Sequence, residues 1–99
     1  MSFVTAYPEE LTTAADSLGG TGSALASLNA AAQGPITGVV PPSSDDVSAL
    51  TAAKFAAHGL LYEQISAQAT AIHEMFVAAL AGSATSYAAA EAANAAAAG

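Results

Sequence analysis

The sequence contains no cysteine, which excludes a disulfide framework and a thiolate metal site. It has one cationic residue, Lys54, against eight acidic residues, so its formal net charge is −7. Nucleic-acid binding depends on cations that neutralise phosphates, and docking on an anionic membrane needs a basic face. The charge balance therefore argues against both kinds of partner.

Long apolar runs are also missing. The N-terminal stretch MSFVTAYPEE has neither the basic region nor the apolar region of a conventional signal peptide. The alanine-rich C-terminal stretch is too short and too weakly hydrophobic to span a bilayer. Taken alone, these two features predict a cytosolic protein.

Bulky apolar side chains are few for a chain of 99 residues, because 29 of the residues are alanine. Ordering a small chain costs roughly 1.5 kcal/mol per residue, and apolar burial returns only about 25 cal/mol per Å². An alanine-rich core buries too little area to offset that cost. The composition therefore predicts that a partner contributes to folding.

No residue pattern indicates catalysis. His58 and His73 do not have the i, i+3 or i+4 spacing that places two metal ligands on one helix face, and both are interpreted as core or rim residues. The GGTG stretch lacks the strand and the following Lys-Ser/Thr of a phosphate-binding loop. We therefore predict no enzymatic activity, no cofactor, no metal site and no small-molecule substrate.

One cluster of breakers, GPITGVVPPSS at residues 34–44, divides the chain into two helical stretches. The patterns predict helices over about 8–33 and about 45–82 or beyond. They form a domain over 1–87, followed by an alanine-rich tail over 88–99.

The first helix is expected to begin at Pro8, with Glu9 and Glu10 at the positive end of its dipole. One apolar stripe follows at helical spacing, with the leucines Leu11, Leu18, Leu25 and Leu28. Three glycines, Gly19, Gly20 and Gly22, interrupt this helix. They indicate either a kink near residue 20 or a close backbone approach to a neighbour.

The second helix is expected to be capped by Ser43 or Ser44, with Asp45 and Asp46 in its first turn. Glu63 and Glu74 point away from its apolar residues and are interpreted as the solvent side. The apolar stripe of this helix comprises Val47, Phe55, His58, Tyr62, Ile65, Ala69, Ile72, Phe76 and Leu80, flanked by Leu50, Leu61 and Met75.

The apolar arc of the second helix spans roughly 200°, more than one neighbouring helix covers. The sequence therefore predicts an all-α fold: an antiparallel two-helix hairpin that completes a four-helix bundle with a second hairpin. Phe3 and Val4 precede the first helix, either as a hydrophobic staple or as an arm against the partner. The predicted partner interface comprises Phe3, Val4, Leu11, Leu18, Leu25, Leu28, Val47, Leu50, Phe55, Tyr62, Ile65, Ile72, Phe76 and Leu80.

Tyr87 and Glu91 lie four residues apart in the alanine-rich stretch SYAAAEAANAAAAG. One interpretation is a tyrosine that closes the core and an acid that aids solubility. The other is a pair presented on one helix face for recognition by another protein.

The whole chain resembles the N-terminal domain of the mycobacterial PE proteins. The resemblance rests on MSFV, on the name-giving pair Pro8 and Glu9, on TGVVPPSSDDVSALTAAKFAAH, and on IHEMFVAALAGSATSYAAAEAANAAAAG. It implies a non-catalytic hairpin that pairs 1:1 with a PPE protein in a four-helix bundle.

The resemblance also implies a route out of the cell. The pair is exported by a type VII (ESX) secretion machinery after an EspG-type chaperone has bound the PPE subunit in the cytosol. The family's secretion motif, Tyr-x-x-x-Asp/Glu just after the second helix, corresponds to Tyr87 and Glu91. The expected location is therefore secreted or at the cell surface, with a role in host interaction or the cell envelope.

Two other hypotheses come from different classes of protein. The wide apolar arc is also compatible with a self-associating, homodimeric helical bundle. Low charge and alanine richness are compatible with an envelope-associated or porin-like component, for which the sequence offers no spanning segment.

Overall fold

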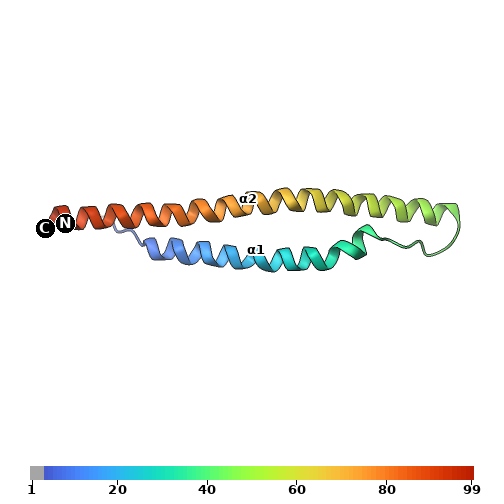
Figure 1. Cartoon of the computed structure of the whole chain (residues 1–99), viewed down its shortest axis with the longest axis horizontal. Helices are drawn as coiled ribbons and strands as arrows, with labels where there is room; N and C mark the ends of the chain where they lie inside the picture. The colour runs from blue at the N-terminus through green and yellow to red at the C-terminus, as the bar shows by residue number, and fades with distance from the viewer. Residues whose placement is uncertain (1–3) are drawn as a thin grey trace. The chain divides into compact units, whose positions relative to one another are not determined.

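The computed structural model describes residues 4–99, so the predicted interface residue Phe3 lies outside the described part of the chain. Two α-helices account for most of this part: α1, Pro8–Thr37, and α2, Asp46–Ala98 (Figure 1). Residues 4–99 contain no strand. The prediction of an all-α chain with two long helices is therefore confirmed.

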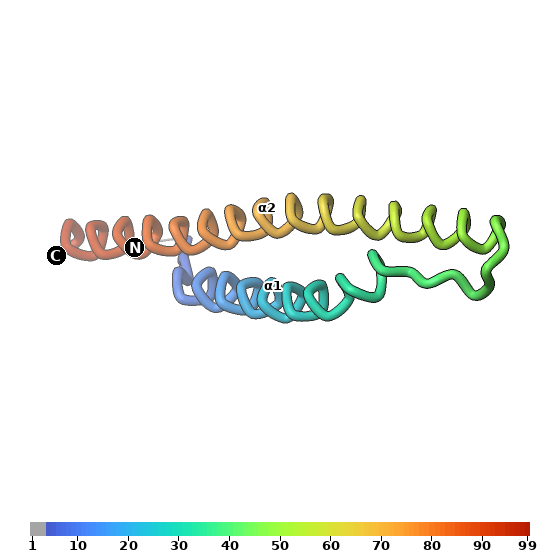
Figure 2. The backbone as a smooth tube through the Cα atoms, turned by 45° about the vertical axis from the view of Figure 1, so that its right-hand side comes forward, coloured from blue at the N-terminus to red at the C-terminus, as the bar shows by residue number. Residues whose placement is uncertain are grey.

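The chain divides into two compact units, and each contains a segment of both helices. The terminal unit combines the residues up to Gly22 with His73–Gly99. The loop unit is Ser23–Ile72 and contains the connection between the helices, an extended segment drawn in green in Figure 2. Within the loop unit the chain is a helical hairpin, because α1 leads through this connection directly back into α2.

Helix α1 continues through Gly34 and Pro35 to Thr37, past the end predicted at residue 33. Proline lacks an N–H, so the helical bond to the carbonyl of Ala31 is not made. The next turn is closed by the Gly38 N–H, which donates to Gly34 O at 2.9 Å. A proline in the last turn therefore does not end this helix.

Helix α2 is capped by Asp45, which corrects the predicted cap at Ser43 or Ser44. The Ser48 N–H donates to Asp45 Oδ1 at 2.8 Å, and Ser48 Oγ donates to Asp45 Oδ2 at 2.9 Å. The cap satisfies one of the N–H groups that a helix start leaves without an intrahelical partner. The two serines lie in the bend before it.

The buried core is very small. Among the described residues only three hydrophobic side chains are buried, Ala15, Ala52 and Ala84. Alanine buries little apolar area, so these residues contribute little to the free energy of folding. The larger side chains of the helices must lie elsewhere, and most of them lie at the surface.

Glycines let the two helices approach each other closely at two places. A Cβ atom on Gly22 would lie 2.9 Å from Cδ2 of His73, and one on Gly59 would overlap the carbonyl oxygen of Ile36. Gly20 has open space around it, and α1 is continuous through all three of its central glycines. Of the two interpretations of these glycines, close approach applies at Gly22.

Candidate protein-interaction face

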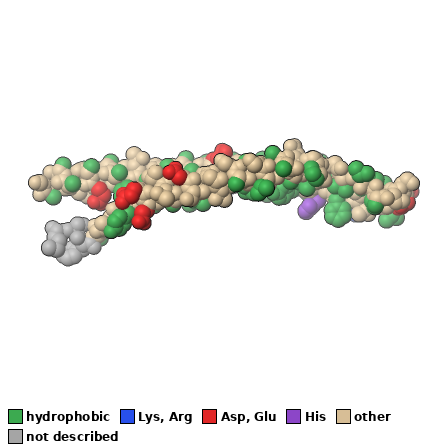
Figure 3. Space-filling view, turned by 90° about the horizontal axis from the view of Figure 1, so that it is seen from below, with side chains coloured by type: hydrophobic (Ala, Val, Ile, Leu, Met, Phe, Trp, Pro, Cys, Tyr) green, Lys and Arg blue, Asp and Glu red, His purple; other side chains and the backbone are tan. Residues whose placement is uncertain are grey.

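Most of the large apolar residues of α2 are exposed. We call seven of them the exposed stripe: Val47, Leu50, Phe55, Tyr62, Ile65, Ile72 and Phe76. Phe55 is 63% exposed and Ile65 is 64% exposed, although both are side chains that normally provide a core. Hydrophobic side chains stand at the surface in Figure 3. Exposed apolar residues at helical spacing are typical of an interaction surface.

The other predicted interface residues fall into two groups. Val4, Leu25 and Leu28 are exposed, like the stripe. Leu11, Leu18 and Leu80 are half-buried. Their positions in the sequence coincide with the surfaces on which α1 and α2 meet, so they serve the chain's own helix pair.

The surface that α2 turns toward α1 carries mostly small and polar residues. We call it the α2 seam, which comprises the buried and half-buried residues Ala52, Ala56, Gly59, Glu63, Ser66, Thr70, His73, Val77, Leu80 and Ala84. Its spacings alternate between four and three residues, the repeat of helices that pack along a seam. The α2 seam and the exposed stripe are therefore separate sets of positions on one helix.

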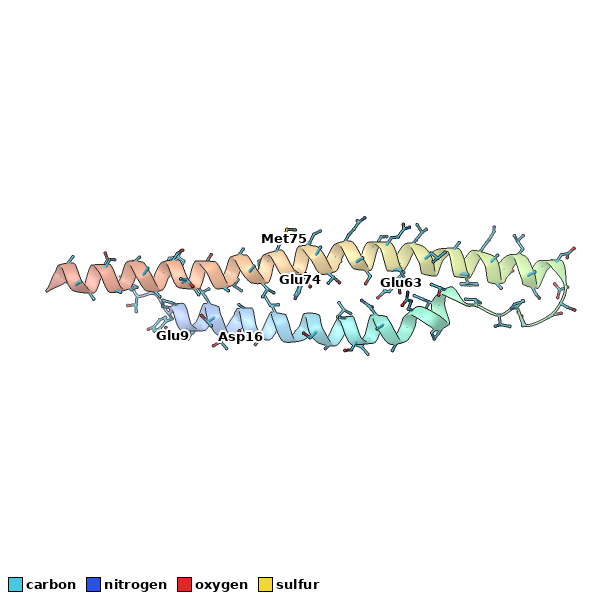
Figure 4. The ribbon with its side chains drawn as sticks, in the orientation of Figure 1. Glu9, Asp16, Glu63, Glu74 and Met75 are labelled. Atoms are coloured by element: carbon cyan, nitrogen blue, oxygen red, sulfur yellow. The ribbon has the colours of Figure 1, made fainter. Side chains whose placement is uncertain are left out.

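Glu63 belongs to the α2 seam, which corrects its interpretation as a marker of the solvent side. It is half-buried, and its Oε1 atom is buried without a hydrogen-bond partner among the described residues. Figure 4 shows Glu63 beside α1 in the loop unit, whereas Met75 projects away from its helix. The prediction was wrong because it placed α1 against bulky residues, whereas α1 packs on small ones. Glu74 is exposed.

A chain of hydrogen bonds joins the helices of the loop unit. Tyr62 Oη donates to Asn29 Oδ1 at 2.6 Å, and Asn29 Nδ2 donates to Ser66 Oγ at 2.7 Å. In the terminal unit, His73 Nε2 lies 2.7 Å from the carbonyl oxygen of Leu18. A carbonyl only accepts, so Nε2 carries the proton in this bond. His73 thus has a structural role in pairing the helices.

A groove of about 490 Å³ lies in the loop unit beside the connection. Its walls come from the end of α1 and the first third of α2, and its lining is almost entirely apolar. The lining residues are Ala32, Pro35, Ile36, Val39, Phe55, His58, Gly59 and Tyr62. His58 is exposed at this groove, which places it at a rim rather than in a core.

Tyr87 and Glu91 lie inside α2, which continues to Ala98. The expected position just after the second helix is therefore wrong for this chain, and the alanine-rich stretch 88–98 is helical. Tyr87 is 53% exposed and Glu91 is exposed as well. Residues four apart lie on the same side of a helix, so both groups are accessible together.

Over residues 4–99, no group of three or more His, Asp or Glu side chains is placed to hold a metal ion. Neither helix, over the same residues, contains a stretch long and apolar enough to cross a membrane.

Sequence reasoning missed Asn29, Gly59 and Ser66. It followed bulky residues, and these three are small or polar. The sequence pattern that identifies Gly59 and Ser66 is the alternation of three- and four-residue spacings between small or polar residues of α2. Asn29 falls in the corresponding repeat of α1, seven residues after Gly22 and seven before Ile36.

Known proteins resemble this chain over most of its length. The family model described as "PE family" matches residues 4–94. The chain is 63% identical to PE family protein PE13 of Mycobacterium tuberculosis over 98 residues, which cover 99% of both chains.

Longer relatives match over the same region. The chain is 51% identical to PE family protein PE8 and to PE-PGRS family protein PE_PGRS33, both of M. tuberculosis. These alignments cover 95% and 97% of this chain but only 34% and 20% of the two relatives. The matched family model and the full-length similarity together lead to one conclusion: this chain belongs to the PE family.

Proposed function

We propose that this chain is the non-catalytic PE subunit of a 1:1 heterodimer with a PPE protein. The observation that carries the proposal is the mismatch between core and surface. The buried hydrophobic side chains of residues 4–99 are three alanines, whereas the seven residues of the exposed stripe are all exposed. Covering a stripe of this kind supplies burial that the chain alone does not have.

In this proposal two helices of the partner pack on the exposed stripe and complete a four-helix bundle. The family resemblance supports the identity of the partner, and the exposed stripe supports the need for one. The α2 seam, in contrast, remains occupied by α1 of the same chain. Pairing with the partner therefore requires no rearrangement of the contacts at Gly22 and Gly59.

We further propose that the heterodimer leaves the cell through a type VII secretion machinery. An EspG-type chaperone holds it in the cytosol through the PPE subunit, and the final location is secreted or at the cell surface. The accessibility of Tyr87 and Glu91 on one side of α2 supports a role for them as the recognised motif.

The test is to purify the chain alone and together with a co-expressed PPE protein. Circular dichroism and sedimentation are then measured on both samples. The proposal expects a molten or aggregated lone chain and a helical 1:1 complex that melts sharply. A lone chain that is a compact, cooperatively melting monomer would overturn it. A discrete, well-folded dimer of the lone chain would favour the homodimeric bundle instead.

A further inference from the structure

Tyr62 has two roles in the loop unit, one for its ring and one for its hydroxyl group. Its ring lines the groove, and its hydroxyl donates to Asn29 Oδ1 at 2.6 Å. Tyr62 is 44% exposed, so the surrounding side chains do not enclose it. Among the described residues, this hydroxyl bond is the polar contact that ties the ring to α1. Without it, the side chain is free to sample other rotamers.

Asn29 is itself held in place. Its Nδ2 donates to Ser66 Oγ at 2.7 Å, one turn of α2 beyond Tyr62, and the residue is half-buried. Both ends of the amide are therefore used, the oxygen by Tyr62 and the nitrogen by Ser66. A half-buried amide with both ends bonded has one preferred orientation. The orientation of Asn29 is therefore fixed, and its bond to Tyr62 Oη holds the Tyr62 ring in place.

The groove that Tyr62 borders is suited to apolar side chains. None of the residues that line it is acidic or basic apart from His58 at its rim. Two of them, Phe55 and Tyr62, also belong to the exposed stripe, so the groove opens onto the face proposed to bind the partner. Apolar pockets within an interface can receive side chains that contribute much of its binding energy.

Charge decides between a second copy of this chain and a different protein as the occupant. One copy carries −7 with a single lysine, so two copies would carry −14 between them. Repulsion between like charges opposes such a pair. A different chain, with apolar residues on one helix face and a less acidic surface, meets no such penalty.

We propose that Asn29 is a positioning residue for partner binding. Through its two hydrogen bonds it holds the Tyr62 ring as one wall of the groove, which receives an apolar side chain from a helix of the partner. Because the two bonds keep the ring in place within the folded complex, they slow the departure of the partner's side chain from the groove. This inference rests on the proposed function, because it assigns a residue to the same partner interface.

The test is a double-mutant cycle on the complex with the co-expressed PPE protein. Its variants are Asn29→Ala, Tyr62→Phe and the combination of both, and the measurement is the dissociation rate. Tyr62→Phe keeps the ring and removes only the donor. Each single variant is expected to dissociate roughly threefold to tenfold faster, since one hydrogen bond is lost. The double variant is expected to dissociate no faster than the Asn29→Ala variant, because both changes break the same link.

Two controls separate positioning from general stability. Asn94→Ala removes the other asparagine of the chain, which is exposed at the end of α2, and is expected to leave the dissociation rate unchanged. Asn29→Asp keeps an acceptor for Tyr62 Oη and accepts from Ser66 Oγ as well, so it is expected to recover most of the lost lifetime. A residue that only stabilises the fold would change the melting temperature without this pattern of rates. If Asn29→Ala fails to fold, Tyr62→Phe alone decides.

Each outcome has a distinct meaning. If the wild-type complex forms and both single variants dissociate at the wild-type rate, the positioning role is overturned and the proposed function stands. Additive effects in the double variant would overturn it as well. If no PPE protein binds the wild-type chain, both proposals fail. A photo-crosslinking residue in place of Phe55 is expected to capture an apolar residue of the partner, and capture of a second copy would overturn the assigned occupant.

Discussion

The imidazole Nε2 of His73 lies 2.7 Å from the carbonyl oxygen of Leu18, and Gly22 provides the space in which the ring lies. The carbonyl belongs to the backbone of α1 and the ring belongs to α2. A histidine of the α2 seam thus bonds directly to the helix backbone opposite. Substitution of Gly22, and of Gly59 at the closer contact, therefore tests how closely the two helices approach.

Gly22→Ala is expected to disturb this contact. The new Cβ would lie 2.9 Å from Cδ2 and 3.0 Å from Nε2 of His73, so the ring must move and its bond to Leu18 is lost. Gly20→Ala is the matched control, because a Cβ there meets nothing within 4 Å. Both changes gain about 1 kcal/mol of helix propensity. We expect only Gly20→Ala to keep that gain, leaving Gly22→Ala less stable than it by about 1 kcal/mol in urea unfolding of the complex. Equal stabilities would contradict the role of His73.

Gly59→Ala is expected to be more damaging, because its Cβ would overlap a backbone atom, Ile36 O, which has little freedom to move. Overpacking of this kind costs about 1–3 kcal/mol. Gly82→Ala, in open space on the same helix, is the control and is expected to stabilise. Thermal unfolding of the complex measures both. A Gly59→Ala variant as stable as Gly82→Ala would mean that the helices are farther apart than described.

The cap of α2 is expected to weaken in acid. Hydrogen bonds from the Ser48 N–H, and then from the Ser43 and Ser48 hydroxyls, lower the pKa of Asp45 from 3.8 to about 2. A carboxyl whose pKa is lower in the folded state stabilises when ionised, so its contribution is complete above pH 3.8 and is lost as the pH falls through about 2. The NMR titration of the Asp45 carboxyl carbon in the complex measures this directly. A midpoint near 3.8 would contradict the cap.

Asp45→Asn is the matched variant for stability. Its side-chain oxygen still accepts from the Ser48 N–H, but it does not titrate. We expect the stability of the Asp45→Asn variant to fall less in acid than that of the wild-type chain, because its cap does not titrate. The Asp46→Asn variant, changed one residue further on, is expected to lose as much stability in acid as the wild-type chain.

Ile65→Asp is expected to abolish partner binding. Ile65 is 64% exposed, in the exposed stripe, and an aspartate there would carry an unpaired charge into an apolar interface. Leu60→Asp is the control. Leu60 is 57% exposed, but at 100° per residue it lies about 140° around α2 from Ile65. Co-purification with the PPE protein is the measurement. Equal loss of binding in both variants would mean that the exposed stripe is not the face that selects the partner.

Tyr87→Ala is expected to prevent export while leaving the heterodimer largely intact, because Tyr87 is exposed near the end of α2. Secretion into the culture medium and co-purification from the cytosol are measured in parallel. Ser86→Ala, at the neighbouring exposed position, is the control and is expected to be exported. Loss of both export and partner binding in Tyr87→Ala would assign the tyrosine to the interface instead.

The sequence predicts the helices and the exposed stripe for one reason: bulky apolar residues and breakers carry strong signals. Phe55 and Ile65 stand out in a chain that is mostly alanine, and so do the prolines of the connection. The contact between α1 and α2 uses weak signals instead. Gly59 and Ser66 do not stand out by hydrophobicity, and the half-buried Glu63 suggested the opposite face. Pairing through small residues is decided by backbone approach, which composition does not report.

The separation of the α2 seam from the exposed stripe also determines how this protein can evolve. A substitution at Gly59 or Ser66 is judged against α1 of the same chain, whatever the partner is. In the proposed heterodimer, a substitution at Ile65 or Phe76 is judged against a surface encoded elsewhere. Under that proposal, duplicated genes can diverge along the stripe and acquire new partners one residue at a time, while the helix pair that presents the stripe is inherited unchanged.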